Sequence, residues 1–237
     1  MPVSNPVLVA LDTPDVDKAR ALAKSVGDAV GGVKLGKEFF TANGPGGVTR
    51  VARTGRRVFL DLKFHDIPNT VAGAVRSALP LQPFMMNVHA SGGAAMMRAA
   101  ADAAAEAGKE PGVDRPFMLA VTVLTSLDEA DLEAVGQDVD TKHQVVRLAL
   151  LAREAGMDGV VCSPQEIVAL RNACGTDFKL VVPGIRPTWA AKGDQKRIMT
   201  PKQAMEAGAD YLVIGRPISA ADNPKEAAEK ISAEISG

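Results

Sequence analysis

Residues 61–70 (Asp-Leu-Lys-Phe-His-Asp-Ile-Pro-Asn-Thr) place acidic and basic side chains at the end of an apolar run. That run, residues 58–60, predicts a buried strand. Because side chains alternate between the two faces of a strand, Asp61 and Lys63 should project to the same side, about 7 Å apart along the backbone. Burying these charges is costly unless they are paired, so the pattern favours a functional site over a structural ion pair. Asp66 supplies a second acid nearby.

A lysine held among carboxylates is suited to proton donation. Nearby negative charges favour its protonated form, whereas a Schiff-base lysine needs a lowered pKa. The same carboxylates would repel an acidic substrate, since two like charges about 4 Å apart cost about 4 kcal/mol at an effective dielectric constant of about 20. If the substrate loses CO2, that repulsion disappears. The lysine can then stabilise and protonate the carbanion that remains on the substrate. Asp61, Lys63 and Asp66 therefore suit a reaction in which the substrate loses CO2.

Polar and charged residues also follow or interrupt other apolar runs. They are Asp12, Lys34, Thr125, Ser126, Arg186, Gly215 and Arg216. The active site of a (β/α) barrel is built from the carboxyl ends of its strands, so these residues are candidates for one cavity. Each taken alone could instead be a helix cap or a solvated base, as Asp12 before Thr13 and Pro14 illustrates.

The end of the last apolar run predicts a phosphate site. Gly215 allows the backbone to approach an anion closely, and Arg216 can bind two phosphate oxygens at once. Gln195 lies in the long connection after the seventh run, where it could close over the same group. A surface salt bridge is the alternative for Arg216.

The elements that must position these residues alternate along the whole chain. Eight apolar runs predict strands: Val7–Leu11, Gly32–Leu35, Val58–Leu62, Met85–His89, Met118–Val123, Gly159–Cys162, Lys179–Val182 and Tyr211–Ile214. Helical periodicity lies between them, as in Asp15–Ser25, Gly92–Ala107, Thr141–Ala155 and Pro164–Ala173. Eight such units predict an α/β protein, a (β/α)8 TIM barrel forming a single domain over residues 1–237. Residues 154–161 and 206–213 resemble each other, which indicates a repeated helix-to-strand unit.

Composition excludes several classes of protein. The chain has 46% hydrophobic and 23% charged residues and a formal net charge of −1, so we expect no binding to nucleic acid or to a membrane. No apolar stretch approaches the roughly 20 residues of a transmembrane helix, and the first residues lack a secretion signal, so a cytoplasmic location is predicted. Cys162 and Cys174 should be buried free thiols, since no metal-ligand spacing is present.

These motifs resemble the bacterial orotidine 5′-phosphate decarboxylase family. The resemblance is carried by residues 61–70, Lys34, residues 124–126, 183–187, 194–195 and 214–217, and it extends from Val7 to about Pro217. It implies a (β/α)8 barrel, a homodimer, and conversion of orotidine 5′-monophosphate to uridine 5′-monophosphate and CO2 without a cofactor or metal, the last step of de novo UMP biosynthesis.

The resemblance also implies a role for each matching residue. Lys63 would protonate C6, Asp61 would lie against the substrate carboxylate, and Lys34 would link Asp61 to the ribose hydroxyls. The remaining residues would bind substrate: Asp12 a ribose hydroxyl, Thr125 and Ser126 the pyrimidine, and Gln195, Gly215 and Arg216 the phosphate with Arg186 beside it. Asp66, Ile67 and Thr70 would reach into the neighbouring subunit's site.

Two alternatives remain open at this point. Metal-dependent sugar-phosphate lyases or decarboxylases of similar barrel share the pattern of Asp61, Lys63 and Asp66, but they carry a glutamate ligand for Mg²⁺ where this sequence has Lys34, whose charge would repel the metal. A non-catalytic nucleotide-binding protein could also use this fold. Magnesium dependence would favour the first, and ligand binding without turnover the second.

Overall fold

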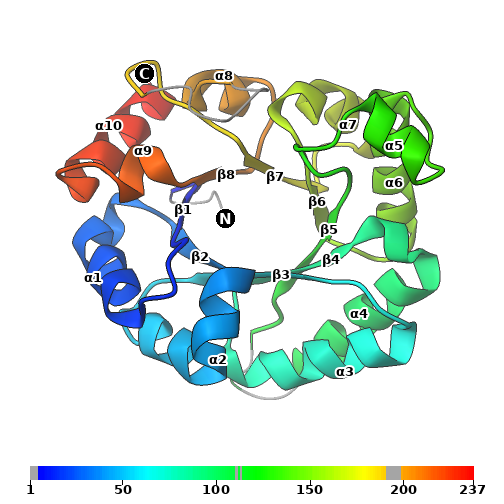
Figure 1. The fold of residues 1–237 in the computed structure, drawn as a ribbon, viewed down its shortest axis with the longest axis horizontal. Helices are drawn as coiled ribbons and strands as arrows, with labels where there is room; N and C mark the ends of the chain where they lie inside the picture. Colours follow the sequence, from blue (N-terminus) through cyan, green and yellow to red (C-terminus); the bar gives the residue numbers. More distant parts are fainter. Residues whose placement is uncertain (1–4, 110–111, 113, 191–198) are drawn as a thin grey trace.

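The computed structural model describes residues 5–109, 112, 114–190 and 199–237. Within them, eight parallel strands close into a barrel in the order β1 to β8, with β8 pairing back onto β1. Figure 1 shows the strands as an inner ring with the helices outside it. The strands are β1 Val7–Ala10, β2 Gly32–Gly36, β3 Val58–Phe64, β4 Met85–His89, β5 Phe117–Val121, β6 Gly159–Val161, β7 Lys179–Pro183 and β8 Tyr211–Ile214. The predicted (β/α)8 barrel is confirmed.

Helices follow the strands around the ring. They are α1 Val16–Val26, α2 Lys37–Ala52, α3 Pro68–Ala78, α4 Ala94–Ala107, α5 Glu129–Ala134, α6 Thr141–Glu154, α7 Ile167–Cys174, α8 Pro201–Glu206, α9 Arg216–Ser219 and α10 Pro224–Ser236. Short 3-10 turns are η1 Gly27–Ala29, η2 Leu79–Leu81, η3 Ala90–Gly92 and η4 Pro164–Glu166. In the part of the chain described, no helix combines the length and the apolar character needed to cross a membrane.

Alternation along the strands divides the core into two layers. A small cluster fills the inside of the barrel: Leu8, Ala10, Phe59, Met85, Leu119, Val181, Tyr211 and Val213. Their neighbours along the same strands, such as Val9 and Leu60, belong to the larger cluster packed against the helices. Side chains two residues apart in a strand point the same way. The alternation that places Ala10 and Phe59 inside the barrel therefore also directs Asp12 and Asp61 inward. The barrel therefore directs its strand-end charges to one mouth.

The two copies of the repeated helix-to-strand segment, residues 154–161 and 206–213, each join two neighbouring strands at the opposite end of the barrel. Gly156 and Gly208 have positive φ angles of 83° and 108°, the left-handed conformation that ends a helix before a strand. Asp158 then accepts a hydrogen bond from the N–H of Met118 at 2.7 Å, and Asp210 accepts one from the N–H of Leu180 at 2.9 Å. Each aspartate thus joins its own strand to the preceding one.

Replacing Asp210 with alanine should destabilise the fold. Its carboxylate also pairs with Arg171 at 2.7 Å and with Lys179 at 3.2 Å, and its side chain is 17% exposed. Removing it takes the paired carboxylate away from Arg171 and Lys179 and the side-chain acceptor away from the Leu180 N–H, so we expect a loss of about 2–4 kcal/mol in the free energy of unfolding. Urea denaturation would measure it. The control Glu226→Ala, which breaks an exposed pair with Lys230, should cost below about 1 kcal/mol.

Candidate active site

Four charged side chains of alternating sign meet at the mouth of the barrel. The Lys34 ammonium lies between two carboxylates, 3.0 Å from Asp12 Oδ1 and 3.3 Å from Asp61 Oδ2. Asp61 Oδ1 in turn lies 2.6 Å from Lys63 Nζ. The order Asp12, Lys34, Asp61, Lys63 is built from three consecutive strands. We call these four residues the charge chain.

The charge chain runs from solvent into the protein. The side chain of Asp12 is 62% exposed, whereas those of Lys34 and Asp61 are 12% and 10% exposed. Lys63, at the far end, is 23% exposed. The sequence predicted a lysine held between carboxylates. Within a single polypeptide chain that lysine is Lys34, whereas Lys63 forms an ion pair only with Asp61 among the residues that the structure describes.

In the inner part of the charge chain, ion pairs and hydrogen bonds together shift the pKa values more than burial does. Burial by itself would raise the pKa of Asp61, but the charges of Lys34 and Lys63 and hydrogen bonds from Lys63 and Asn87 hold that pKa below its ordinary value of 3.8. Burial would likewise lower the pKa of Lys34, but the charges of Asp61 and Asp12 raise it above 10.5. Both groups are therefore charged at neutral pH.

Asp61 should contribute stability that depends on pH. A carboxyl group whose folded pKa lies below 3.8 stabilises the fold above that pH, and the contribution is lost as the pH falls through the folded value. Asp61→Asn should cost about 2–4 kcal/mol at pH 7, because Lys63 loses its paired carboxylate and Lys34 keeps only its contact with Asp12. The difference from wild type should shrink below about pH 4. Urea titrations between neutral and acid pH would measure it. Asp17→Asn, at a carboxylate that is 71% exposed, is the control and should cost below about 1 kcal/mol.

A cavity of about 190 Å³ opens beside the inner part of the charge chain. Its lining residues are Lys34, Phe59, Asp61, Lys63, Val121, Val123, Leu124, Thr125, Val161, Cys162, Pro183 and Val213. Most of its wall is apolar and its charges come from β2 and β3, so it can hold a flat ring with one edge against Asp61 and Lys63. Burial raises the pKa of the Cys162 thiol well above its usual range, which keeps that side chain neutral and unreactive.

A second cavity, of about 290 Å³, lies at the ends of β7 and β8. It is lined by Arg186, Trp189, Ala190, Arg216, Pro217, Ala220 and Ala221. A Cβ added at Gly215 would lie 3.6 Å from Ala10 Cβ and 4.0 Å from Asp12 Oδ2, which places the last strand end against the first. Two guanidinium groups suit an anion such as phosphate. Gln195, predicted to act here, lies outside the described residues.

Four predicted site residues stand apart from the charge chain. Ile67 is 66% exposed, and Asp66, Thr70 and Ser126 are also exposed. The Asp66 carboxylate accepts a hydrogen bond from the N–H of Ile67 at 2.6 Å. Thr125, by contrast, lines the central cavity. The structure thus gathers Asp12, Lys34, Asp61 and Lys63, and it leaves Asp66 facing solvent at the start of α3.

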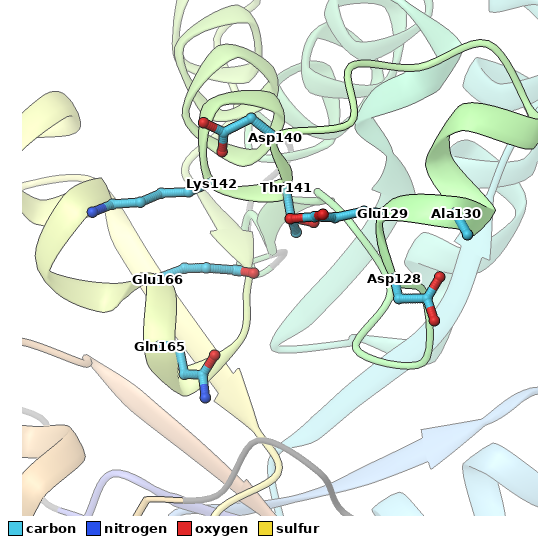
Figure 2. Close-up of a pocket in the computed structure, with 8 residues that line it drawn as sticks. All are labelled: Asp128, Glu129, Ala130, Asp140, Thr141, Lys142, Gln165 and Glu166. Carbon is cyan, nitrogen blue, oxygen red and sulfur yellow. The ribbon is translucent and has the colours of Figure 1, made fainter.

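A larger cavity, of about 710 Å³, lies outside the barrel mouth among α5, α6 and η4. Figure 2 shows its lining side chains, which include the carboxylates of Asp128, Glu129, Asp140 and Glu166. The Lys142 side chain extends away from Glu129 in the same view. Four acids against one lysine disfavour a phosphorylated ligand, because like charges repel. The smaller cavity at the charge chain is the better candidate.

Comparison with known proteins agrees with this geometry. A sequence model of the orotidine 5'-phosphate decarboxylase / HUMPS family matches residues 5–231. The chain belongs to this family. Orotidine 5'-phosphate decarboxylase of Rhodospirillum rubrum is 56% identical over 234 residues, covering 98% of this chain and 95% of the relative. That of Paramagnetospirillum magneticum is 54% identical over 231 residues, 98% of each.

A solved structure shares both the fold and the family. The crystal structure of orotidine 5'-phosphate decarboxylase from Lactobacillus acidophilus superposes with a TM-score of 0.87 at 38% identity, covering 98% of this chain and 100% of that one. The resemblance carried by residues 61–70 and the other strand ends is therefore confirmed. The relatives from Rhodospirillum rubrum and Paramagnetospirillum magneticum both carry the decarboxylase name.

Asn87 is a residue of this site that the sequence interpretation missed. It is fully buried in β4. Its Nδ2 donates to Asp61 Oδ1 at 2.7 Å, and its Oδ1 accepts the N–H of Lys63, also at 2.7 Å. The signal in the sequence was an amide inside the apolar run 85–88. Buried amides are satisfied by partners, and its partners here are the two charged residues of β3.

Two histidines also meet near the charge chain. The rings of His65 and His89 lie 5.7 Å apart between centroids. Burial, then the charges of His65, Lys37 and Lys63, lower the pKa of His89 to about 4. His89 is therefore neutral at neutral pH and adds no charge beside Lys63.

Proposed function

We propose that this protein decarboxylates orotidine 5′-monophosphate to uridine 5′-monophosphate and CO2, the last step of de novo UMP biosynthesis. The observation that carries the proposal is the charge chain at an apolar cavity, in a chain more than half identical to named decarboxylases of this type. The cytoplasm is the proposed compartment, since substrate and product are charged, water-soluble nucleotides.

The geometry supports a division of the substrate between the two cavities. The arginines of the outer cavity, Arg186 and Arg216, would bind the phosphate, with Gln195 and Gly215 beside them. The pyrimidine would enter the central cavity, where Thr125 lines the wall, and Ser126 would contact it from the rim. Asp12 and Lys34, at the outer end of the charge chain, would hold the ribose hydroxyls between these two positions.

The chemical step would take place at the inner end of the charge chain. The substrate carboxylate would lie against the ionised Asp61, so ground-state repulsion adds to the driving force. When the C6–carboxylate bond breaks, CO2 leaves and the electron pair remains on C6. Lys63 would stabilise that pair and transfer a proton to it, after which solvent reprotonates the lysine. The residues named in these steps need no cofactor or metal to balance atoms and charges.

Lys34 separates this proposal from the metal-dependent alternative. Its ammonium occupies the space between Asp12 and Asp61, at 3.0 and 3.3 Å from their oxygens. Two carboxylates that could otherwise bind a divalent cation are already neutralised here by a lysine, and its charge would repel Mg²⁺. We therefore assign the chain to the decarboxylases of its family.

The complete site would include a second copy of the chain. Asp66, Ile67 and Thr70 are exposed immediately after β3, and the large apolar side chain of Ile67 is 66% exposed. An exposed apolar residue beside an exposed carboxylate suits a subunit contact. We propose a homodimer in which these three residues reach the neighbouring active site.

One assay tests the function directly. Purified protein should deplete the absorbance of orotidine 5′-monophosphate and release CO2 at an undiminished rate in the presence of EDTA. Turnover that required added Mg²⁺ would favour the sugar-phosphate alternative. Tight nucleotide binding with no CO2 release would favour a binding protein, and either result would overturn the proposal.

A further inference from the structure

The backbone of β3 is irregular at its reactive lysine. Leu60 pairs with Met86, but Phe64 pairs with Val88, so three residues of β3 face the single residue Asn87. Lys63 has a φ angle of +51°, in the left-handed region that side chains other than glycine rarely adopt. Such strain persists only where the surroundings hold it in place, and it is often found at functional sites.

Asn87 provides a hydrogen-bond acceptor where the regular backbone hydrogen bonding between β3 and β4 is interrupted. In a parallel pair the strand N–H groups donate to carbonyl groups of the neighbouring strand. Here the N–H of Lys63 donates to the side-chain oxygen of Asn87 at 2.7 Å. A side chain thus takes the place of a backbone acceptor and satisfies the N–H of Lys63 where the register is irregular.

The nitrogen of the same Asn87 side-chain amide is hydrogen-bonded to Asp61. Asn87 Nδ2 donates to Asp61 Oδ1 at 2.7 Å, and this oxygen is the one that Lys63 Nζ contacts at 2.6 Å. The orientation of the amide is fixed by its partners, because its oxygen must face the N–H and its nitrogen must face the carboxylate. One rigid side chain therefore sets both the main chain of Lys63 and the carboxylate that pairs with its ammonium.

We propose that Asn87 is a positioning residue for the decarboxylation, which rests on the function proposed above. It fixes the Lys63 backbone and the Asp61 carboxylate relative to each other, so that the proton donor stays aimed into the cavity when Asp61 faces the substrate. Misplacing a reacting group by about 1 Å can cost about 100-fold in rate. A neutral amide performs this task without adding charge beside the carboxylate. An aspartate at the same place would put two acids in contact.

Two variants and a matched control test this role. Asn87→Ala removes both hydrogen bonds. Asn87→Asp keeps the shape and the acceptor for Lys63 but places a carboxylate against Asp61. Met86→Ala, one residue earlier in β4, removes another fully buried side chain, and it lies on the helix-facing side of the strand away from Asp61 and Lys63. Thermal unfolding should show how much each variant loses in stability, and kcat, KM and the pH profile would be measured where all are folded.

We expect Asn87→Ala to lower kcat by about 100-fold with KM for orotidine 5′-monophosphate changed only a few-fold, because the phosphate and ribose contacts are retained. For Asn87→Asp, the acid limb of the kcat/KM profile should move to higher pH by about one unit or more, since one of two adjacent carboxyl groups takes up a proton more readily. Met86→Ala should lower the melting temperature while kcat stays near the wild-type value.

The outcomes separate this role from a structural one. Equal kcat for folded Asn87→Ala and wild type, with stability lost as in Met86→Ala, would overturn the proposal. So would an acid limb unchanged in Asn87→Asp, and that variant decides the question by itself if Asn87→Ala does not fold. Wild-type protein without decarboxylase activity would instead refute the proposed function, so the two failures are distinguishable.

Discussion

Lys63→Ala should lower kcat by about 10³-fold or more while affinity for uridine 5′-monophosphate stays within a few-fold of wild type. The variant loses both the proton donor and the positive charge beside the developing carbanion, and each contribution alone is commonly worth about 10²-fold or more. The product carries no carboxylate at C6, so its binding should depend on the proposed phosphate and ribose contacts, which do not involve Lys63. Steady-state kinetics and product titration by calorimetry would separate the two effects.

The surroundings of Lys63 make this variant interpretable. Asp61 keeps its contact with Lys34 at 3.3 Å and its hydrogen bond from Asn87, so its charge remains compensated after the truncation. Lys225→Ala is the matched control: this lysine is 61% exposed on α10, and the activity of the variant should equal that of wild type. A kcat within tenfold of wild type for Lys63→Ala would take the proton-donor role away from Lys63.

Much of the architecture follows from the sequence by elementary rules. Apolar runs separated by helical stretches predict the strands to within one or two residues, because strands covered on both faces must be apolar throughout. The inward direction of Asp12, Lys34 and Asp61 also follows, since side chains alternate in register with buried neighbours such as Phe59. Strand periodicity alone therefore predicts which charges face the cavity.

The arrangement of those charges depends on features that strand periodicity does not encode. The irregular register between β3 and β4 extends β3 to Phe64, two residues beyond the predicted end at Leu62. It also brings Asn87 between Asp61 and Lys63. Pairings across strands depend on register, and an insertion in one strand is set by the tertiary packing rather than by local pattern. For the same reason, the two ion pairs of Lys34 could not be predicted from the sequence.

The position of Asp66 limits what one chain can do. Ionised acids near Lys63 were expected from the sequence to come from both Asp61 and Asp66, yet in the described part of one chain only Asp61 forms an ion pair with Lys63. Asp66 is exposed and hydrogen-bonded to the adjacent N–H. A second subunit would supply the missing carboxylate if the dimer places Asp66 across the interface. The reaction mechanism would then depend on formation of the dimer.

Mixing Asp66→Ala with Lys63→Ala protein should restore activity that neither variant has alone. In a two-fold symmetric dimer with a shared site, a mixed dimer carries both substitutions in one site and none in the other. Random exchange of equal amounts makes half of the dimers mixed, so about a quarter of all sites should be intact and activity should approach about a quarter of wild type. Initial rates after incubation would measure the recovery, and native mass spectrometry would verify the exchange.

A second mixture shows whether the recovery depends on Asp66 crossing the interface. Asp61 and Lys63 are in contact within one chain, at 2.6 Å, so Asp61→Ala mixed with Lys63→Ala leaves one substitution in every site of a mixed dimer. That mixture should stay inactive. If the Asp66→Ala mixture also stayed inactive after verified exchange, Asp66 would act in its own chain's site and the shared-site proposal would be wrong. Recovery confined to the Asp66→Ala mixture follows only from a carboxylate supplied by the partner, because no other distribution of these residues yields an intact site.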